Sequence, residues 1–260
     1  MSIIAEATEV VRYRGLIRQL ATRDLKLRYE RNVLGFLWSL LNPLLMIVIY
    51  TFVFSMVLNA GIQRFPMYLV PVMLPWNFLV RCMLGVSPLI YQSGYLLNRA
   101  AFPSESIILG GLLSAFVDFC LEMVVFIIVI AALGADLLPG ILFVPIAMVI
   151  HVIFVTGITF FFAVGYVFYR DTQYLTNILS TAWFFMTPIF YQVASIPAQY
   201  QALYSLNPMV HIAAIFREPL YSNTIPSVET YITASATAIG TFLLGWLVFN
   251  KYKREFAELL

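Results

Sequence analysis

The sequence predicts an all-α integral membrane protein. Of its 260 residues, 62% are hydrophobic and only 11% are charged, and the mean hydropathy is +0.89. Soluble domains average about 25% charged residues and about half apolar residues. Six apolar stretches approach the roughly 20 residues that a helix needs to cross a bilayer. These spans are expected at Val33–Leu58, Pro66–Gln92, Ile107–Leu133, Leu137–Phe168, Leu175–Tyr191 and Tyr231–Phe249.

Two of these spans carry residues that interrupt regular helices. The second contains Pro71, Pro75 and Pro88, and the fifth is short and contains Pro188. Breaks of this kind persist in lipid only where other helices or water satisfy the freed backbone groups. The second span is therefore expected to be kinked or partly unwound.

The distribution of positive charge predicts the orientation of the chain. With the N-terminus in the cytoplasm, 12 of the 15 Lys and Arg residues fall on the cytoplasmic side. Only Arg64 and Arg217 fall outside, and Arg81 lies within a span. The positive-inside rule then places both termini in the cytoplasm, which requires an even number of spans. The first apolar run begins behind a long charged arm and is too long for a cleavable signal peptide.

The first 32 residues form a basic arm with a helical pattern. Tyr13, Leu16, Ile17, Leu20 and Leu27 recur at helical spacing, and most of the arginines lie off that stripe. A basic amphipathic helix of this kind lies in the membrane interface, beside anionic lipid headgroups. An ordinary basic flank is the alternative. The chain is otherwise treated as one domain, with spans over 33–249 and a short tail over 250–260.

Two loops carry patterns of their own. Residues 94–106 favour a short helix that Pro103 stops, typical of a segment that docks into a partner's cleft; a plain turn is the alternative. Residues 192–228 contain two apolar-periodic pieces on either side of Asn207 and Pro208, each too short to cross a bilayer. Long loops with internal structure are usually functional, so re-entrant or interfacial helices are expected before the last span.

Charged residues fall inside two of the predicted spans. Asp118 and Glu122 are four residues apart and share one helix face, and Arg81 lies in the preceding span. Charges at this depth are costly and normally face a bundle interior or water. They fit the polar wall of a conduit, an ion pair of Arg81 with a carboxylate that fixes helix packing, or a proton relay.

Aromatic residues make up 16% of the chain. The default role of aromatics in membrane proteins is packing and interface belts. Aromatic faces also suit sliding contact with sugar rings, because stacking needs no fixed hydrogen-bond register. The candidates to line a conduit are therefore Tyr50, Trp76, Phe78, Arg81, Asp118, Glu122, Trp183, Phe185 and Tyr191.

Several chemistries are excluded by the sequence. It contains no G-x-x-x-x-G-K-[ST] motif, so the chain cannot bind ATP in the P-loop manner. It contains no H-E-x-x-H motif and no paired cysteines, because Cys82 and Cys120 sit singly in apolar runs. No resident cofactor, no metal and no nucleic-acid partner is expected, and no catalytic residues are assigned.

The order of motifs resembles a known family. "LGFLWSLLNPLL" follows the basic arm, "LPWNF" lies in the second span, and "LLNRAAFPSES" lies in the first cytoplasmic loop. "FYRDTQY" then precedes "TPIFY", and "YSLNPM" precedes "IFREPLY". Together these motifs resemble the membrane subunit of an ABC-2-type polysaccharide exporter, the class that moves O-antigen, capsule or teichoic acid chains.

The resemblance implies a working unit and a location. A homodimer of this chain would bind two copies of a separate ABC ATPase subunit, which would hold ATP and Mg²⁺. The cargo would be a polysaccharide on an undecaprenyl-diphosphate lipid, exported across the bacterial inner membrane. Closure of the ATPase would tilt the two membrane subunits as rigid bodies and open the path between them.

The resemblance also implies roles for particular segments. The arm at Arg12–Arg31 would be an interface helix against the ATPase, and Leu96–Glu105 would be the coupling helix. The segment Asn207–Tyr221 would gate the exit. The implied coupling residues are Arg23, Arg28, Arg99, Phe102, Pro103 and Glu105, and the implied outer-gate residues are Asn207, Pro208 and Arg217.

Two other functions compete with the exporter. A secondary transporter would be driven by protons through Asp118 and Glu122, and would work without an ATPase. A membrane enzyme acting on lipid-linked sugars would make product by itself, but the sequence lacks a clustered set of catalytic polar residues. A neighbouring ATPase gene would favour the exporter.

Overall fold

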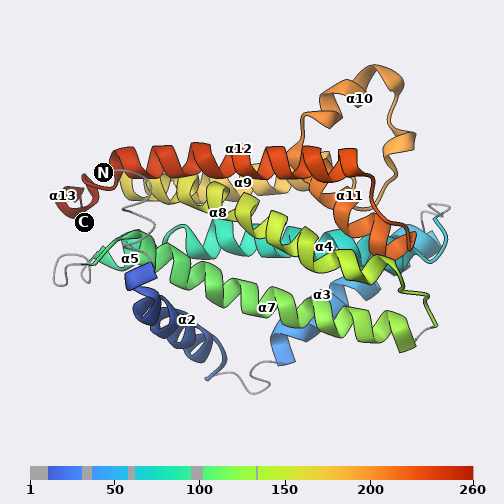
Figure 1. Ribbon diagram of the computed structural model, residues 1–260, viewed down its shortest axis with the longest axis horizontal. Helices are drawn as coiled ribbons and strands as arrows, with labels where there is room; N and C mark the ends of the chain where they lie inside the picture. The colour runs from blue at the N-terminus through green and yellow to red at the C-terminus, as the bar shows by residue number, and fades with distance from the viewer. Residues whose placement is uncertain (1–10, 31–36, 58–61, 95–101, 133, 260) are drawn as a thin grey trace.

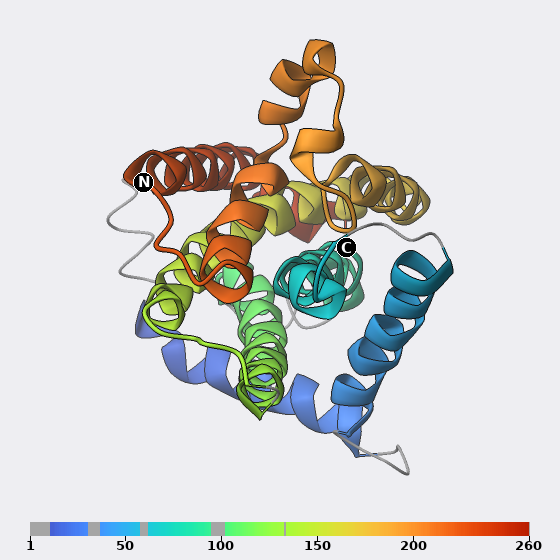
Figure 2. The same cartoon turned by 90° about the vertical axis from the view of Figure 1, so that its right-hand side faces the viewer.

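The computed structural model describes residues 11–30, 37–57, 62–94, 102–132 and 134–259, and all of their regular elements are helices (Figures 1 and 2). The longest helices run along the long axis of the molecule and pack side by side (Figure 1). The prediction of an all-α fold is confirmed. The chain alternates between two ends of this bundle, one marked by α2 (Arg14–Tyr29) and the other by α10 (Ala198–Ser205), and these are called the α2 end and the α10 end below.

Four helical stretches are long and apolar enough to cross a membrane. They confirm the second, third, fourth and sixth predicted spans, with boundaries within a few residues. The stretches are Phe65–Gln92, Glu105–Ala132, Gly140–Phe168 and Val228–Tyr252. In order they comprise α4 (Phe65–Arg81), π-helix η2 (Cys82–Val86) and α5 (Leu89–Gln92); α7 (Glu105–Ala132); 3-10 helix η3 (Gly140–Phe143) and α8 (Val144–Phe168); and α12 (Val228–Tyr252).

The first predicted span is helical over its described part. It comprises α3 (Leu37–Thr51) and a π-helical continuation, η1 (Phe52–Val57). Residues 33–36 and 58 of the prediction lie outside the described residues. Most described side chains of α3 are exposed in the single chain, Val48 and Ile49 among them.

The fifth predicted span is wrong at its end. Helix α9 (Thr172–Met186) has only 15 residues, and the chain is extended at Thr187. Pro188 explains this end, because the residue before a proline is pushed out of the helical region. The prediction had continued the helix to Tyr191, since the apolar run continues that far.

The second span is interrupted by one irregular turn, which lies after Pro71 and Pro75 and just before Pro88. Helix α4 continues through Pro71 and Pro75, and its π-helical turn η2 begins directly after Arg81. His151 of α8 supports the proline-bearing part, because its Nε2 lies 2.9 Å from the Pro75 carbonyl oxygen. The predicted irregularity of this span is therefore present as a π-helical turn between Pro75 and Pro88.

Helix α2 lies across α7 at the α2 end (Figure 2). Its inner side includes Leu20, which packs against the core, and the buried Ala21. Gly110 of α7 makes the contact close, since a Cβ on it would lie 2.8 Å from the Leu20 Cβ. The predicted stripe is thus used largely for packing on α7, whereas Leu27 is 63% exposed.

Helices α8 and α12 pack with their backbones in contact. A Cβ on Gly245 would lie 2.0 Å from the Gly157 carbonyl oxygen, and one on Gly157 would lie 2.5 Å from the Phe242 Cα. Small residues at a crossing let helices approach closely in membranes, where van der Waals packing contributes much of the association. This pair forms one side of the bundle.

The long outer loop folds as two helices, as predicted. Helix α10 follows η4 (Val193–Ser195) and projects from the body (Figures 1 and 2). Helix α11 (Pro208–Tyr221) returns and packs against α4, α8 and α12. A final short helix, α13 (Phe256–Leu259), closes the chain at the α2 end (Figure 1).

Candidate functional site

An ion-pair network joins α2 to two spans. Arg28 lies 2.7 Å from an Asp24 oxygen on its own helix and 2.7 Å from an oxygen of Asp118 on α7. Arg81 of α4 lies 3.4 Å from the same Asp118 oxygen and is paired with Glu122. The Ser114 hydroxyl donates to Asp24 over 2.6 Å. The ion pair of Arg81 with a carboxylate, one of the predicted alternatives, is present.

The α7 carboxylates of the network are buried, whereas Asp24 and Arg28 on α2 are about a third exposed. Asp118 is the fourteenth of the 28 residues of α7, and its side chain and that of Glu122 are each 1% exposed. A buried carboxylate needs a counter-charge, and the two arginines supply it. Arg28, a predicted ATPase contact, is therefore turned towards α7, and Arg81, Asp118 and Glu122 contact one another within the chain.

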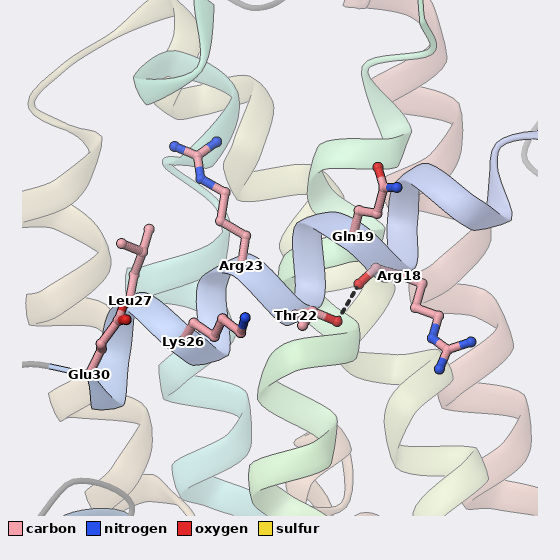
Figure 3. Close-up of a pocket in the computed structure, with 7 residues that line it drawn as sticks. All are labelled: Arg18, Gln19, Thr22, Arg23, Lys26, Leu27 and Glu30. Carbon is pink, nitrogen blue, oxygen red and sulfur yellow. Dashed lines mark hydrogen bonds between the residues drawn. The ribbon is translucent and has the colours of Figure 1, made fainter.

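The outer side of α2 is basic. A groove of about 450 Å³ lies there, lined by α2 residues. Figure 3 shows Arg18 and Arg23 extending to opposite sides of the helix. Lys26 adds a third cation, and Glu30 is the single acid among the groove residues. Thr22 donates to the Arg18 carbonyl oxygen over 2.9 Å, so its hydroxyl is directed to the helix backbone.

Of the predicted coupling segment Leu96–Glu105, the structure describes only residues 102–105. Arg99 lies outside the described residues, whereas Phe102 and Pro103 are partly exposed just before α7. Glu105 is different, because its side chain is 4% exposed and lies 2.6 Å from the Lys253 ammonium. This pair ties the start of α7 to the end of α12, so Glu105 faces its own chain.

The predicted conduit residues fall into two groups. Trp76 and Phe78 are buried in the core, Phe78 stacking on Phe119 with ring centroids 5.1 Å apart. Trp183 touches Trp76 edge-on from α9. Phe185 is 60% exposed, whereas Tyr50 and Tyr191 are partly buried. Phe185, Tyr50 and Tyr191 can therefore contact a molecule that passes outside the single chain, whereas the buried Trp76 and Phe78 cannot.

Asn207 holds the end of α9 against the start of α11. Its side-chain oxygen accepts from the Trp183 Nε1 at 2.8 Å and from the Met209 amide at 3.0 Å, and its side-chain nitrogen donates to the Met186 carbonyl over 3.0 Å. It is thus both the N-cap of α11 and a clamp on α9. Pro208 follows at the first helical position, where a proline is best tolerated.

Arg217 holds the extended segment after α9. Its guanidinium donates to the carbonyl oxygens of Pro188 at 2.7 Å, Ile189 at 3.0 Å and Tyr68 at 3.3 Å. It also lies 3.8 Å from the centre of the Tyr68 ring. Burial lowers the pKa of Arg217 to about 10, so the group stays charged at neutral pH. Two of the three predicted gate residues, Asn207 and Arg217, therefore contact one segment, 187–191, Asn207 through a bond to the Thr187 hydroxyl at 3.4 Å.

Sequence reasoning missed four residues of these clusters. Asp24 and Ser114 complete the network, Lys253 pairs with Glu105, and Tyr68 receives Arg217. The spacing of Asp24 and Arg28 on one helix face was a visible signal for the first. The others depend on helix packing, which no local pattern reveals. Among the described residues, no three His, Cys, Asp or Glu side chains form a group that could hold a metal ion.

Comparison with known proteins identifies the family of the chain. The family model described as ABC-2 type transporter matches residues 15–221. An O-antigen export system permease protein RfbA of Myxococcus xanthus is 28% identical over 96% of this chain and 97% of its own length. One from Klebsiella pneumoniae is 28% identical over 94% and 95%.

A more distant relative is named for a different cargo. The polysialic acid transport protein KpsM of Escherichia coli is 24% identical over 78% of this chain and 80% of its own length. The family match covers more than half of the chain and begins within α2. The resemblance seen in the motif order is confirmed, and the protein belongs to the ABC-2 type transporter family.

Proposed function

We propose that the chain is the permease subunit of an ATP-driven exporter of a lipid-linked polysaccharide, with an undecaprenyl-diphosphate carrier and O-antigen as the leading cargo class. The relatives named for O-antigen export match nearly their whole length. Two copies of the chain and two copies of an ABC ATPase form the working unit in the bacterial inner membrane. ATP and Mg²⁺ bind the ATPase, since this sequence lacks a phosphate-binding loop.

The observation that carries the proposal is the basic outer face of α2. Arg18, Arg23 and Lys26 project from a helix whose other side is packed on α7. This face lies at the same end as Phe102 and Pro103, just before α7. A charged helix face beside a partly exposed aromatic residue suits a soluble partner that docks from the cytoplasm.

The dimer is favoured by the surface of α9. Only Thr176 and Ser180 of this helix are buried, and Ile178 is 66% exposed. Phe185 on the same helix is exposed as well. A path between two copies would use these side chains, whereas Trp76 and Phe78 fill the core of each copy.

The carboxylates weigh against proton-coupled transport. Asp118 and Glu122 are both paired with arginines and are 1% exposed. A relay needs a carboxylate that can take up and release a proton along a path to water. In the proposed mechanism these groups stay paired with the arginines while the two subunits tilt.

The test is reconstitution with the candidate ATPase in lipid nanodiscs. The double variant Arg23→Glu, Lys26→Glu reverses two charges of the outer face of α2. It is expected to lose co-purification of the ATPase and the associated ATP hydrolysis, and Phe102→Asp is expected to weaken both.

The matched control is Arg64→Glu, an exposed charge reversal on the loop that leads into α4 at the α10 end. It is expected to behave as wild type. Wild-type protein that binds no ATPase, or a double variant that binds it normally, would contradict the proposed docking.

A further inference from the structure

The ion-pair network around Arg28 connects α2, whose outer side is exposed, to the spans α7 and α4. Its first part joins α2 to α7 through Asp24, Arg28 and Asp118. Asp24 and Arg28 are four residues apart on α2, and Ser114 and Asp118 are four apart on α7, so each helix contributes one face. Both pairs of contacts keep the same register, since Asp24 meets Ser114 and Arg28 meets Asp118.

The second part of the network joins α7 to α4. Asp118 is shared, because Arg28 approaches one of its oxygens at 2.7 Å and Arg81 approaches the same oxygen at 3.4 Å. Arg81 continues to Glu122. A displacement of Arg28 therefore changes the electrostatic environment of Arg81 directly, through one carboxylate.

The contact between α2 and α7 leaves little space for independent movement at its cytoplasm-facing part. Gly110 lies under Leu20, and any side chain there would meet the Leu20 Cβ at 2.8 Å. Close apolar packing and charge pairing thus occur on the same pair of helices, two turns apart. α2 is fastened along its inner face while its outer face stays exposed.

Arg81 stands at the point where α4 changes its hydrogen-bond pattern. The π-helical turn η2 begins at Cys82, the next residue. Single π-helical turns within α-helices are frequent at functional sites, and they are places where a helix bends. The network therefore ends on the residue that precedes this irregular turn.

We propose that Arg28, Asp118 and Arg81 are positioning residues that transmit movement of α2 to α4. This inference rests on the proposed ATP-driven function, in which the ATPase moves α2. Pressure on the outer face of α2 passes through Arg28 to α7, and through the shared Asp118 to Arg81 and the irregular turn of α4. Arg28 acts inside the permease, and the ATPase contacts are left to the basic outer face.

The test measures movement at both ends of the complex. Val11 precedes α2 and is 61% exposed, and Gln63 precedes α4 at the other end and is exposed. Spin labels on Val11→Cys or Gln63→Cys, in a Cys120→Ser background, report the distance between the two copies by double electron–electron resonance. Distances are compared with and without ATP in the nanodisc complex with the ATPase, together with ATP hydrolysis.

Arg28→Gln is expected to keep the ATP-dependent shift at Val11→Cys and ATP hydrolysis, and to lose the shift at Gln63→Cys. Arg254→Gln, the same substitution on an exposed cytoplasmic residue, is expected to keep both shifts. A Gln63→Cys shift that survives Arg28→Gln would overturn the inference, and so would equal loss of both shifts in an assembled complex.

Arg28→Lys keeps the measurement possible if Arg28→Gln does not assemble. Lysine retains the charge but not the planar fork that bridges Asp24 and Asp118, so a reduced shift at Gln63→Cys with a full shift at Val11→Cys is expected. An undiminished outer shift would overturn the inference. Absence of any ATP-dependent shift in wild type would instead count against the proposed function itself.

Discussion

The packing of α8 on α12 depends on Gly157 and Gly245, where the two backbones are in contact. A methyl group on Gly245 would lie 2.0 Å from the Gly157 carbonyl oxygen, and this neighbour is backbone that cannot rotate away. Gly240 lies on the same helix with nothing within 4 Å of its would-be Cβ. The two glycines thus look alike in the sequence and differ completely in their surroundings.

Gly245→Ala is therefore expected to destabilise the protein by about 3 kcal/mol, the upper end for overpacking. Gly240→Ala is expected to be neutral or to stabilise by about 0.5–1 kcal/mol, because alanine restricts the unfolded chain more than glycine. Thermal loss of the monodisperse peak in detergent measures both. Equal behaviour of the two variants would show that the backbone contact is absent.

Asn207 combines a helix cap with a clamp on α9. Asn207→Ala removes the acceptor of the Met209 amide and leaves the Trp183 Nε1 without its partner. A lost cap costs about 1 kcal/mol and an orphaned buried donor about 1–3 kcal/mol, so about 2–4 kcal/mol is expected.

The reference for this variant is Ser227→Ala. Ser227 caps α12 by accepting from the Thr230 amide at 3.1 Å, in an exposed position. Its loss is expected to cost about 1 kcal/mol. The same thermal assay compares them, and an Asn207→Ala cost no larger than that of Ser227→Ala would argue against the clamp.

At the scale of elements, the segment 187–191 depends on α11. Arg217 holds the carbonyls of Pro188 and Ile189 with one fork of donors, and the compact ammonium of lysine cannot reproduce that geometry. Arg217→Lys is expected to open this segment locally while α8 and α12 stay intact. Hydrogen–deuterium exchange should rise in peptides covering 187–196 and stay unchanged in the long helices.

The comparison for this prediction is Arg64→Lys, an exposed arginine in the loop before α4. It is expected to leave exchange in 187–196 at the wild-type level. Faster exchange throughout the molecule in Arg217→Lys would mean that Arg217 supports the whole bundle rather than one segment.

Elements were predictable where hydropathy alone decides them. The long runs that became α7, α8 and α12 carry enough apolar residues to be recognised without any tertiary information. The end of α9 at Met186 and the irregular turn after Arg81 were placed wrongly or not at all. Pro188 is a local signal for the end of α9, which the continuing apolar run concealed, whereas the place of the irregular turn between Pro75 and Pro88 depends on helix packing that no local pattern reveals.

At the scale of the whole molecule, the two ends of the bundle differ in charge. The basic outer face of α2 and the tail with Lys251, Lys253 and Arg254 lie at one end, whereas α10 projects at the other (Figure 1). By the positive-inside rule we expect the basic end to face the cytoplasm. The proposed docking face would then lie on the cytoplasmic side and the predicted gate residues on the other side.

This orientation predicts opposite labelling of two cysteines in a Cys120→Ser background. Gln19→Cys on α2 is expected to react with an impermeant maleimide only in inverted membrane vesicles, and Ala202→Cys on α10 only in spheroplasts. Both positions are exposed in the chain. Reaction of both cysteines from one side would refute the assignment.

The helices of the arm and of the loop over 192–228 were predictable from local patterns, but their side-chain contacts were not. The motif order assigned functional roles to these segments, and those roles stay predictions. It assigned Arg28 and Glu105 outward roles, whereas the fold pairs them with Asp118 and Lys253. Which face of a helix a charge occupies depends on the helix that packs beside it, and this information is not local.

The π-helical turn at Cys82–Val86 also sets a phase relationship along the second span. A turn closed by bonds to the fifth residue holds about one residue more than an α-helical turn, and each residue in an α-helix advances by about 100°. The faces of the helix before and after this turn are therefore rotated relative to each other, compared with a continuous α-helix. Deleting Gly85, whose would-be Cβ meets nothing within 4 Å, would restore the α-helical repeat and rotate α5 relative to Arg81 without shortening any packed side chain.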